Sequence, residues 1–273
     1  MLSFVTWNVS PVAINLFGHE VRWYGLCWAL GFLIGYYLVS RIFQKEKLPA
    51  EWVDKLFIYT ILASIIGARL GHCFFYQWDY YSQHPLEILA IWEGGLASHG
   101  GVICLIAALI VYSRTVTKKS VWWLFDRMVP AIGICCGLIR LGNLMNSEIF
   151  GYPTTLPWGF YFVRSQEWRE LYNGLPCHPT QIYEMLYCLA AAVIAWFMQR
   201  RPALMQRTGL ITGVSLLIFF GTRFLLEFMK NPQVERELQM SLNIGQQLSI
   251  PFILLGLYLI ITAWRNPHPK RWL

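Results

Sequence analysis

The sequence has little charge. Only 14% of its 273 residues are Asp, Glu, Lys or Arg, whereas a soluble domain usually carries about 25%. Hydrophobic residues make up 56%, and runs such as 23–40 and 102–113 contain no charge at all. A large soluble protein with an apolar core is the alternative, but such uninterrupted runs argue against it. We therefore predict an integral membrane protein.

Several catalytic and metal-binding motifs are missing. The seven cysteines form no C-x-x-C pair, and the histidines form no H-x-x-x-H pair, so we expect neither a zinc site nor a disulfide framework. Most of the cysteines lie in or beside apolar runs, where a thiol behaves as a small hydrophobic group. The sequence also has no G-x-S-x-G elbow and no phosphate-binding Walker loop. These absences weigh against metal hydrolysis, serine hydrolysis and nucleotide chemistry.

Basic residues are sparse at the start of the chain and clustered elsewhere. Residues 1–17 contain no Lys or Arg, which a cleavable signal peptide would need. The net charge is +7, but the basic residues do not form a stripe with interleaved aromatics, so a nucleic-acid partner is not indicated. They sit in short clusters between apolar runs, as in the connections of a membrane protein.

A membrane helix needs about 20 mostly apolar residues. The apolar runs predict an all-α integral membrane protein of about seven transmembrane helices, with all of 1–273 as one transmembrane domain. The run at 96–113 is short and opens with glycines, so it could begin as a re-entrant segment. The connection 144–178 is rich in Trp, Tyr, Gly and Pro, and we expect a small outer cap there. The spans are expected near 22–40, 56–76, 96–113, 121–141, 180–198, 209–228 and 245–264.

The two sets of connections differ in basic residues. One set has 12 Lys and Arg: Arg41, Lys45, Lys47, Arg114, Lys118, Lys119, Arg200, Arg201, Arg207, Arg265, Lys270 and Arg271. The other set has 5: Arg22, Arg164, Arg169, Lys230 and Arg236. Since cytoplasmic connections carry the excess of basic residues, we expect the N-terminus outside and the C-terminus in the cytoplasm.

Three arginines, Arg69, Arg140 and Arg223, lie inside apolar spans. An unpaired charge at mid-bilayer costs about 2.5–3.5 kcal/mol on insertion scales, so these residues need partners or a wet cavity. With the predicted orientation, polar groups from six spans lie at one depth. We therefore expect a polar site in the outer half of the bilayer, built from Tyr24, Arg69, His99, Arg140, Asn143, Asn146, Glu148, His178, Gln181, Glu184, Arg223 and Glu227.

The densest polar stretch next to a span runs from Arg140 to Gly151. On a helix, Arg140, Asn143 and Asn146 share a face through their spacing of three. The planar fork of arginine suits a phosphate, and asparagine amides could orient a lipid headgroup. The alternative is a helix end at which the arginine reaches toward water and the asparagines cap the helix. We favour the site, because ionisable groups in membranes are usually functional.

Arg223 and Glu227 lie four residues apart and could form a self-neutralising pair on one helix. A ligand role is equally compatible with this span taken alone. The order Arg-then-Glu is the weaker one for a helical pair. We therefore expect either residue to have a second partner on another helix.

His99 is surrounded by four glycines, at 94, 95, 100 and 101. Glycine lets a backbone approach a ligand closely, and an imidazole can act as a general base near neutral pH. Glycine-mediated helix packing is the alternative. Arg69 lies between Gly67 and Gly71, and we expect it mainly to hold helices together. His178, Gln181 and Glu184 open a helix, where they could cap its end and satisfy arginine partners.

Seven motifs, in this order, resemble those of the prolipoprotein diacylglyceryl transferase family of bacterial inner-membrane enzymes. The resemblance covers nearly the whole chain. The motifs are Arg22-Trp-Tyr24-Gly, Gly67-Ala-Arg69-Leu-Gly, Gly94-Gly-Leu-Ala-Ser-His99-Gly-Gly, Arg140-Leu-Gly-Asn143-x-x-Asn146-x-Glu148-x-x-Gly151, His178-Pro-Thr-Gln-Ile-Tyr-Glu184, Arg223-Phe-Leu-Leu-Glu227 and Gly245-Gln-x-Leu-Ser-x-Pro251.

The resemblance implies a reaction, the first step of bacterial lipoprotein maturation. The diacylglyceryl group of phosphatidylglycerol passes to the thiol of the lipobox cysteine of a prolipoprotein, a thioether forms, and glycerol phosphate leaves. Neither a metal nor an organic cofactor is implied. The resemblance also places the enzyme in the bacterial cell inner membrane, with the N-terminus periplasmic.

The resemblance also suggests roles for single residues. Arg140 and Arg223 would stabilise the charge that develops on the phosphate, and His99 is the candidate base for the thiol. Substrate contacts are expected from Tyr24, Arg69, Gly100, Asn143, Asn146, Glu148, Gly151 and Glu227. His178, Gln181 and Glu184 are expected to support them.

Three positions depart from the family pattern, and two other functions compete with the transferase. Ile139 replaces a usual glycine, Leu144 a usual phenylalanine, and Phe219 a frequent tyrosine four residues before Arg223. None of these removes a charged residue with an expected role. A transporter for an anionic lipid would also need intramembrane arginines, but the sequence has no internal repeat. A non-catalytic lipid-binding scaffold would tolerate the loss of His99.

Overall fold

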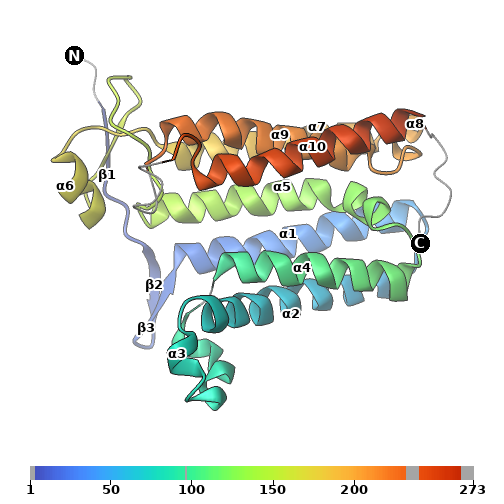
Figure 1. Cartoon of the computed structure of the whole chain (residues 1–273), viewed down its shortest axis with the longest axis horizontal. Coiled ribbons are helices and arrows are strands. Elements are labelled where there is room, and N and C mark those ends of the chain that lie inside the picture. Colours follow the sequence, from blue (N-terminus) through green and yellow to red (C-terminus); the bar gives the residue numbers. More distant parts are fainter. Residues whose placement is uncertain (1–3, 96, 232–239, 266–273) are drawn as a thin grey trace. The chain divides into compact units, whose positions relative to one another are not determined.

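The structure is a computed structural model that describes residues 4–95, 97–231 and 240–265. Seven helical segments of the described chain are long and apolar enough to cross a membrane (Figure 1). Each coincides with one of the predicted spans, so the all-α membrane fold is confirmed. The segments are Trp23–Lys45, Ala50–Phe75, His99–Thr117, Val121–Met145, Thr180–Gln199, Leu210–Met229 and Ile244–Arg265.

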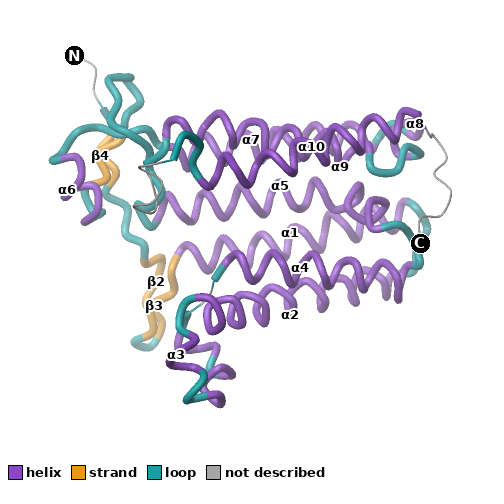
Figure 2. Tube along the Cα trace, viewed as in Figure 1, coloured by secondary structure: helices purple, strands orange, loops and turns teal. Residues whose placement is uncertain are grey.

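The long helices are joined by short helices, loops and a few strands (Figure 2). The long helices are α1 (Trp23–Lys45), α2 (Ala50–Phe75), α4 (Ser98–Tyr112), α5 (Val121–Met145), α7 (Thr180–Gln199), α9 (Leu210–Leu226) and α10 (Ile244–Arg265). The shorter ones are α3 (Trp78–Tyr81), α6 (Gln166–Tyr172), α8 (Pro202–Met205), η1 (Pro85–Leu89), η2 (Ile91–Glu93), η3 (Ser113–Thr117) and η4 (Glu227–Met229). The strands are β1 (Val5–Trp7), β2 (Val12–Leu16), β3 (His19–Arg22) and β4 (Phe160–Phe162).

Local sequence explains where several helices begin and end. Pro49 and Pro179 precede the first residues of α2 and α7, where a proline costs no helical hydrogen bond. In α6, the Ser165 hydroxyl accepts from the Trp168 amide at 3.2 Å, and Asn173 ends the helix in the left-handed conformation.

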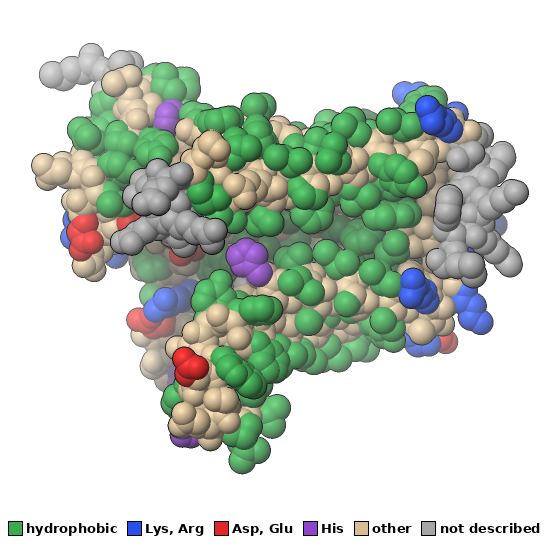
Figure 3. Space-filling model, in the orientation of Figure 1, with side chains coloured by type: hydrophobic (Ala, Val, Ile, Leu, Met, Phe, Trp, Pro, Cys, Tyr) green, Lys and Arg blue, Asp and Glu red, His purple; other side chains and the backbone are tan. Residues whose placement is uncertain are grey.

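Apolar side chains remain exposed along the long helices. Leu33 of α1 is 62% exposed, Leu62 of α2 52% and Leu254 of α10 60%. On the face drawn in Figure 3, hydrophobic side chains cover the lengths of the helices. Such surfaces would be unfavourable in water. They fit a protein whose long helices contact lipid.

The chain divides into two compact units, with boundaries inside α1 and α5. The first unit comprises the described residues of 1–38 and 125–265, and the second comprises residues 39–124. The single domain expected over 1–273 stays a prediction.

In the first unit, β1 pairs in parallel with β4, and β2 pairs antiparallel with β3. The segment between α5 and α7 packs on a cluster of buried side chains: Leu144, Phe150, Phe160, Phe162, Trp168 and Cys177. The Trp7 indole donates to the Leu144 carbonyl at 2.9 Å, so the N-terminal strand is tied to the end of α5. The region expected as a cap is therefore an ordered layer with its own apolar core. Its position on the outer side stays a prediction.

In the second unit, α2 and α4 pack closely through glycines. A Cβ on Gly100 would lie 2.3 Å from the Gly67 carbonyl oxygen, and one on Gly71 would lie 2.7 Å from the Gly100 Cα. Small residues allow this close approach of helices. Residues 98–117 are helical throughout; a re-entrant start of this span stays a prediction.

Candidate active site

Arg140 and Glu184 join α5 to α7. The Nε of Arg140 lies 2.9 Å from Oε2 of Glu184, whose side chain has no exposed surface. A buried carboxylate is costly unless it is paired. This pair confirms the prediction that residues at the start of α7 satisfy arginine partners.

Lys230 is the second cation at Glu184. Its Nζ lies 2.6 Å from Oε1 of Glu184 and 3.4 Å from Oε1 of Glu227. The Lys230 side chain is only 3% exposed. Lys230 is therefore buried between two carboxylates. Its expected place in an outer connection stays a prediction.

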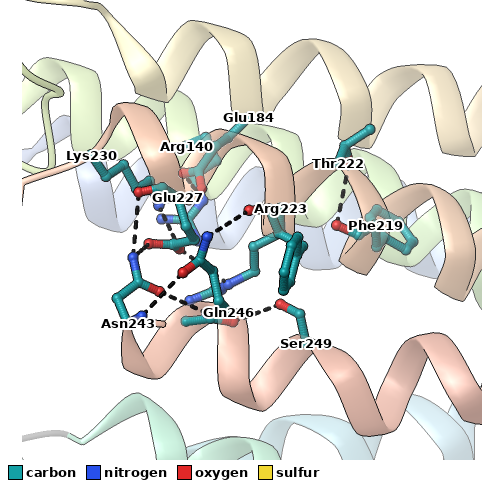
Figure 4. A network of polar contacts seen from close by, with 12 residues as sticks. Arg140, Glu184, Phe219, Thr222, Arg223, Glu227, Lys230, Asn243, Gln246 and Ser249 are labelled. Atoms are coloured by element: carbon teal, nitrogen blue, oxygen red, sulfur yellow. Dashed lines mark hydrogen bonds and ion pairs between the residues drawn. The ribbon is translucent and has the colours of Figure 1, made fainter. Parts of the chain in front are cut away.

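Arg223 completes the network. Its Nε lies 3.4 Å from Oε1 of Glu227, and Oε2 of Glu227 accepts from Nδ2 of Asn243 at 3.1 Å. The expected pair of Arg223 and Glu227 is therefore present. The further partners of Glu227 are Lys230 and Asn243, which lie next to helix ends and not on another helix as expected. Arg140, Glu184, Lys230, Glu227 and Arg223 form one series of alternating charges, here called the charge chain (Figure 4).

The two ends of the charge chain are its most accessible members. The side chains of Arg140 and Arg223 are 22% and 34% exposed, whereas those of the three inner residues are between 0% and 9% exposed. Among the described residues, the two terminal nitrogens of Arg223 have no hydrogen-bond partner. The carboxylates are therefore enclosed, and guanidinium groups face outward. This arrangement favours an anionic ligand.

Asn143 connects Arg140 to a third carboxylate. Its Oδ1 accepts from Nη1 of Arg140 at 3.3 Å, and its Nδ2 donates to Oε1 of Glu148 at 2.7 Å. Asn146 donates to the same oxygen at 3.2 Å. The predicted shared face of Arg140 and Asn143 is confirmed, and Asn146 joins them through Glu148. With Glu148 included, three carboxylates balance three cations, which makes the cluster tolerable inside a membrane protein.

The loop that carries Glu148 has an unusual backbone. Ser147 and Ile149 have φ angles of 55° and 59°, which are unfavourable for a β-branched residue such as isoleucine. The Gln181 amide donates to the Glu148 carbonyl at 2.6 Å, and the Thr180 hydroxyl donates to the Ile149 carbonyl at 2.8 Å. Such strain persists only where surrounding contacts impose it. The start of α7 therefore fixes the position of Glu148, which gives Gln181 a supporting role.

Gly151 allows two backbone segments to meet. A Cβ at this position would lie 2.3 Å from the Met229 carbonyl oxygen, and Gly151 and Lys230 form a β-bridge. The Gly151 amide also donates to the His178 carbonyl at 2.9 Å. This contact therefore helps to place Lys230 in the charge chain.

His178 lies beside this contact. Its Nδ1 is 3.2 Å from the Tyr183 hydroxyl. Burial lowers the pKa of His178, which favours the neutral imidazole. These contacts agree with the supporting role expected for His178.

Tyr24, at the start of α1, packs against α5 at Gly142. A Cβ on Gly142 would lie 2.8 Å from the Tyr24 ring. Gly142 is the neighbour of Asn143 in the sequence, so the ring lies next to the helix turn that carries Asn143. The first unit thus gathers all the expected site residues except Arg69, His99 and Gly100.

Arg69, His99 and Gly100 belong to the second unit. The Arg69 guanidinium donates to three backbone carbonyls, of Ile88 at 3.0 Å, Gly94 at 2.7 Å and Glu87 at 2.5 Å. Arg69 is 2% exposed; it holds the connection after α2 in place and does not join two long helices as expected. His99 is exposed in the first turn of α4, and Gly100 lies in the helix contact described above. Their expected part in catalysis and substrate binding stays a prediction.

Four further residues, which the sequence patterns do not mark as functional, lie in or beside the charge chain: Lys230, Asn243, Gly245 and Gln246. A Cβ on Gly245 would lie 2.5 Å from the Glu227 carboxyl carbon, so a glycine lets α10 reach this carboxylate. Gln246 donates its backbone amide to Oδ1 of Asn243 at 2.7 Å. The motif that begins with Gly245-Gln246 is the sequence signal for this contact. No sequence pattern indicates that Lys230 belongs to the site, because it follows an apolar span as many interfacial lysines do.

No metal centre is found in the described part of the chain, since no three His, Cys, Asp or Glu side chains there form a group that could hold an ion. The charge chain instead consists of carboxylates paired with arginine and lysine.

Comparison with known proteins gives one consistent result. The family model described as prolipoprotein diacylglyceryl transferase matches residues 11–262. Proteins named phosphatidylglycerol–prolipoprotein diacylglyceryl transferase are similar over almost their whole length. The one from Porphyromonas gingivalis is 49% identical and the one from Chloroherpeton thalassium 44%, each over 98% of both chains. That of Bacteroides fragilis is 38% identical over 99% of both. The chain belongs to the prolipoprotein diacylglyceryl transferase family.

Proposed function

We propose that this membrane protein transfers the diacylglyceryl group of phosphatidylglycerol to a cysteine thiol of a prolipoprotein. Its relatives carry this activity in their names. The sulfur forms a bond to the terminal glycerol carbon of the lipid, and the bond between that carbon and the phosphate oxygen breaks. Glycerol phosphate leaves with the electron pair of that bond. The thiol proton passes to a base and then to water or to the leaving phosphate.

The charge chain is the observation that carries this proposal. A phosphodiester has one negative charge, and the departing phosphate monoester gains a second as the bond breaks. Arg140 and Arg223 are the exposed ends of the charge chain, so their guanidinium groups can approach the phosphate. Fixed donors directed at developing charge stabilise a transition state. Glu184, Glu227 and Lys230 hold these donors in place from the buried side.

Amide groups next to Arg140 are suited to orient the glycerol headgroup. Asn143 and Asn146 are fixed by Glu148, so their side chains are preorganised rather than free to rotate. Tyr24 packs beside them. We assign these three residues to lipid positioning, with Gly151 holding the backbone next to Lys230.

The thiol also has to be activated. A cysteine with an ordinary pKa of about 8.5 is only a few per cent thiolate at neutral pH. We assign His99 as the base, because its imidazole is exposed and the family motif places it among glycines that allow close approach. The acceptor would be the cysteine that follows a lipoprotein signal peptide.

The membrane orientation is also part of the proposal. The excess of basic residues in one set of connections favours a periplasmic N-terminus and a cytoplasmic C-terminus. The site residues would then lie in the outer half of the inner membrane.

A transfer assay tests the function. Purified protein in phosphatidylglycerol vesicles is incubated with a signal-like peptide that ends in one cysteine, and the peptide mass is measured. We expect the mass of one diacylglyceryl group to be added. The matched controls are the same peptide with serine in place of cysteine, and vesicles of phosphatidylcholine. Lipid movement without a modified peptide would indicate a transporter, and binding alone would indicate a scaffold; both would contradict the proposal.

A further inference from the structure

The turn between β2 and β3 has an unusual sequence for its shape. Leu16 pairs with His19, so the loop consists of Phe17 and Gly18 alone. Their φ angles are 51° and 86°, and two positive φ values in a two-residue loop define a type I′ turn. Asn-Gly and Asp-Gly are strongly preferred in this turn, whereas a phenylalanine at positive φ is strained. A requirement other than turn formation must therefore favour Phe17.

The tip of the hairpin is also apolar and exposed. Phe17 is 102% exposed, and its neighbours Ile14 and Leu16 are 50% and 47% exposed. Single exposed hydrophobic residues are common on protein surfaces, but here three lie together within four positions of one hairpin. Both the strained backbone of Phe17 and the exposed apolar side chains would be unfavourable if the tip of the hairpin were surrounded by water.

The hairpin has an apolar face and a polar face. Ile14 pairs with Val21 and Leu16 with His19 on one face of the hairpin, which is apolar except for the exposed His19. Asn15 pairs with Glu20 on the opposite face. Glu20 also lies 3.5 Å from Arg22 in an exposed ion pair. An apolar face opposite charged groups is the pattern of segments that lie on a membrane surface.

The base of the hairpin is continuous with a membrane helix. β3 ends at Arg22 and α1 begins at Trp23, and the Trp23 amide donates to the Pro11 carbonyl at 3.0 Å. Trp23 and Leu26 are 38% and 41% exposed. Figure 1 shows the hairpin joined directly to the first turn of α1, so its base lies beside the end of a predicted membrane helix. Its strands extend only about 15 Å at roughly 3.3 Å per residue.

We propose that the hairpin of residues 12–22 docks on the lipid leaflet at which α1 begins. The side chains of Ile14, Leu16 and Phe17 enter the boundary between headgroups and acyl chains, while Asn15 and Glu20 face water. The apolar face contacts the bilayer itself, because it adjoins the lipid-exposed start of α1. This inference does not depend on the transferase reaction.

Photocrosslinking to lipid tests this contact. p-Benzoylphenylalanine is introduced singly at position 16, 17, 15 or 20, and each protein is irradiated in phosphatidylcholine nanodiscs. Mass spectrometry then measures covalent lipid adducts. We expect adducts at 16 and 17, comparable to those at the exposed α1 position 33, and few at 15 and 20. Equal yields on the two faces, or adducts at 33 but not at 17, would overturn the proposal. Crosslinks at 17 to a second protein copy in place of lipid would also overturn it.

A second variant separates docking from folding. Phe17→Asn introduces the preferred Asn-Gly turn, so the hairpin should form at least as well as before. The thermal midpoint should not fall, yet lipid adducts from a crosslinker at position 16 should decrease several-fold. An unchanged adduct yield would show that Phe17 does not anchor the hairpin and would contradict the proposal.

Discussion

At the scale of single residues, Arg140 shows how one side chain combines charge with geometry. Its Nε pairs with Glu184 at 2.9 Å, and its Nη1 contacts Asn143 at 3.3 Å. A lysine could keep the first interaction but has no planar fork for the second or for two phosphate oxygens. Charge and geometry can therefore be separated by mutation.

We expect Arg140→Lys to reduce turnover by about 10²-fold or more, the scale for the loss of one transition-state donor. The protein should still insert, because lysine can pair with Glu184. Turnover is measured by peptide mass, and the amount of protein in the membrane serves as the control. Turnover within a few-fold of the unmodified protein would mean that only the charge matters.

Mutation of His99 tests whether this residue activates the thiol or only helps to bind a substrate. Glutamine at this position keeps a polar side chain but cannot accept a proton at neutral pH. If His99 is the base, His99→Gln should lose turnover at pH 7 and recover part of it as the pH rises toward the thiol pKa of about 8.5, where thiolate forms unaided. The unmodified protein should gain much less over the same range.

A pH profile of turnover for both proteins checks this prediction. Near-normal turnover of His99→Gln at pH 7, with a flat response to pH, would remove His99 from catalysis. It would then be left with a packing or lipid-orienting role.

At the scale of elements, the charge chain depends on how α5, α7, α9 and the start of α10 are brought together. Gly151 is important here, because its contact with the Met229 carbonyl places Lys230 between two carboxylates. A backbone carbonyl cannot move aside as a flexible side chain can. A methyl group at position 151 therefore has to displace the backbone.

We expect Gly151→Ala to lower turnover by about 10²-fold, since a misplacement of about 1 Å can have this effect. Gly221→Ala on α9 is the matched control, because a Cβ there meets nothing within 4 Å. It should keep normal turnover, and thermal midpoints show whether both variants fold. Equal turnover in the two variants would contradict the positioning role of Gly151.

The sequence could predict the helices better than the network between them. Long apolar runs fix the seven spans, because a bilayer demands length and hydrophobicity together. The pairs of Arg140 with Asn143 and of Arg223 with Glu227 follow from helical spacing. The burial of Lys230 depends on two tertiary contacts, that of Gly151 with the Met229 carbonyl and that of Gly245 in α10 with Glu227. No local pattern around Lys230 distinguishes it from an interfacial lysine.

At the scale of the whole molecule, the orientation in the membrane decides which leaflet supplies the lipid. The proposed orientation places Gln83 outside and Lys119 and Gln206 inside. All three residues are exposed, so each can be replaced by cysteine for labelling.

A membrane-impermeant thiol reagent added to intact cells should modify Gln83→Cys. It should reach Lys119→Cys and Gln206→Cys only after the membrane is opened. The unmodified protein, which keeps its seven native cysteines, gives the background. The reverse labelling would overturn the orientation and with it the outer-leaflet site.

The central claim is a transfer of the diacylglyceryl group that uses arginine side chains and no metal ion. The most direct test is the ratio of glycerol phosphate released to peptide modified, measured in phosphatidylglycerol vesicles with a chelator present. We expect one glycerol phosphate for each thioether-linked peptide, at a rate that the chelator does not change. Release of glycerol phosphate without peptide modification, or transfer that stops with the chelator and resumes with zinc or magnesium, would contradict the claim.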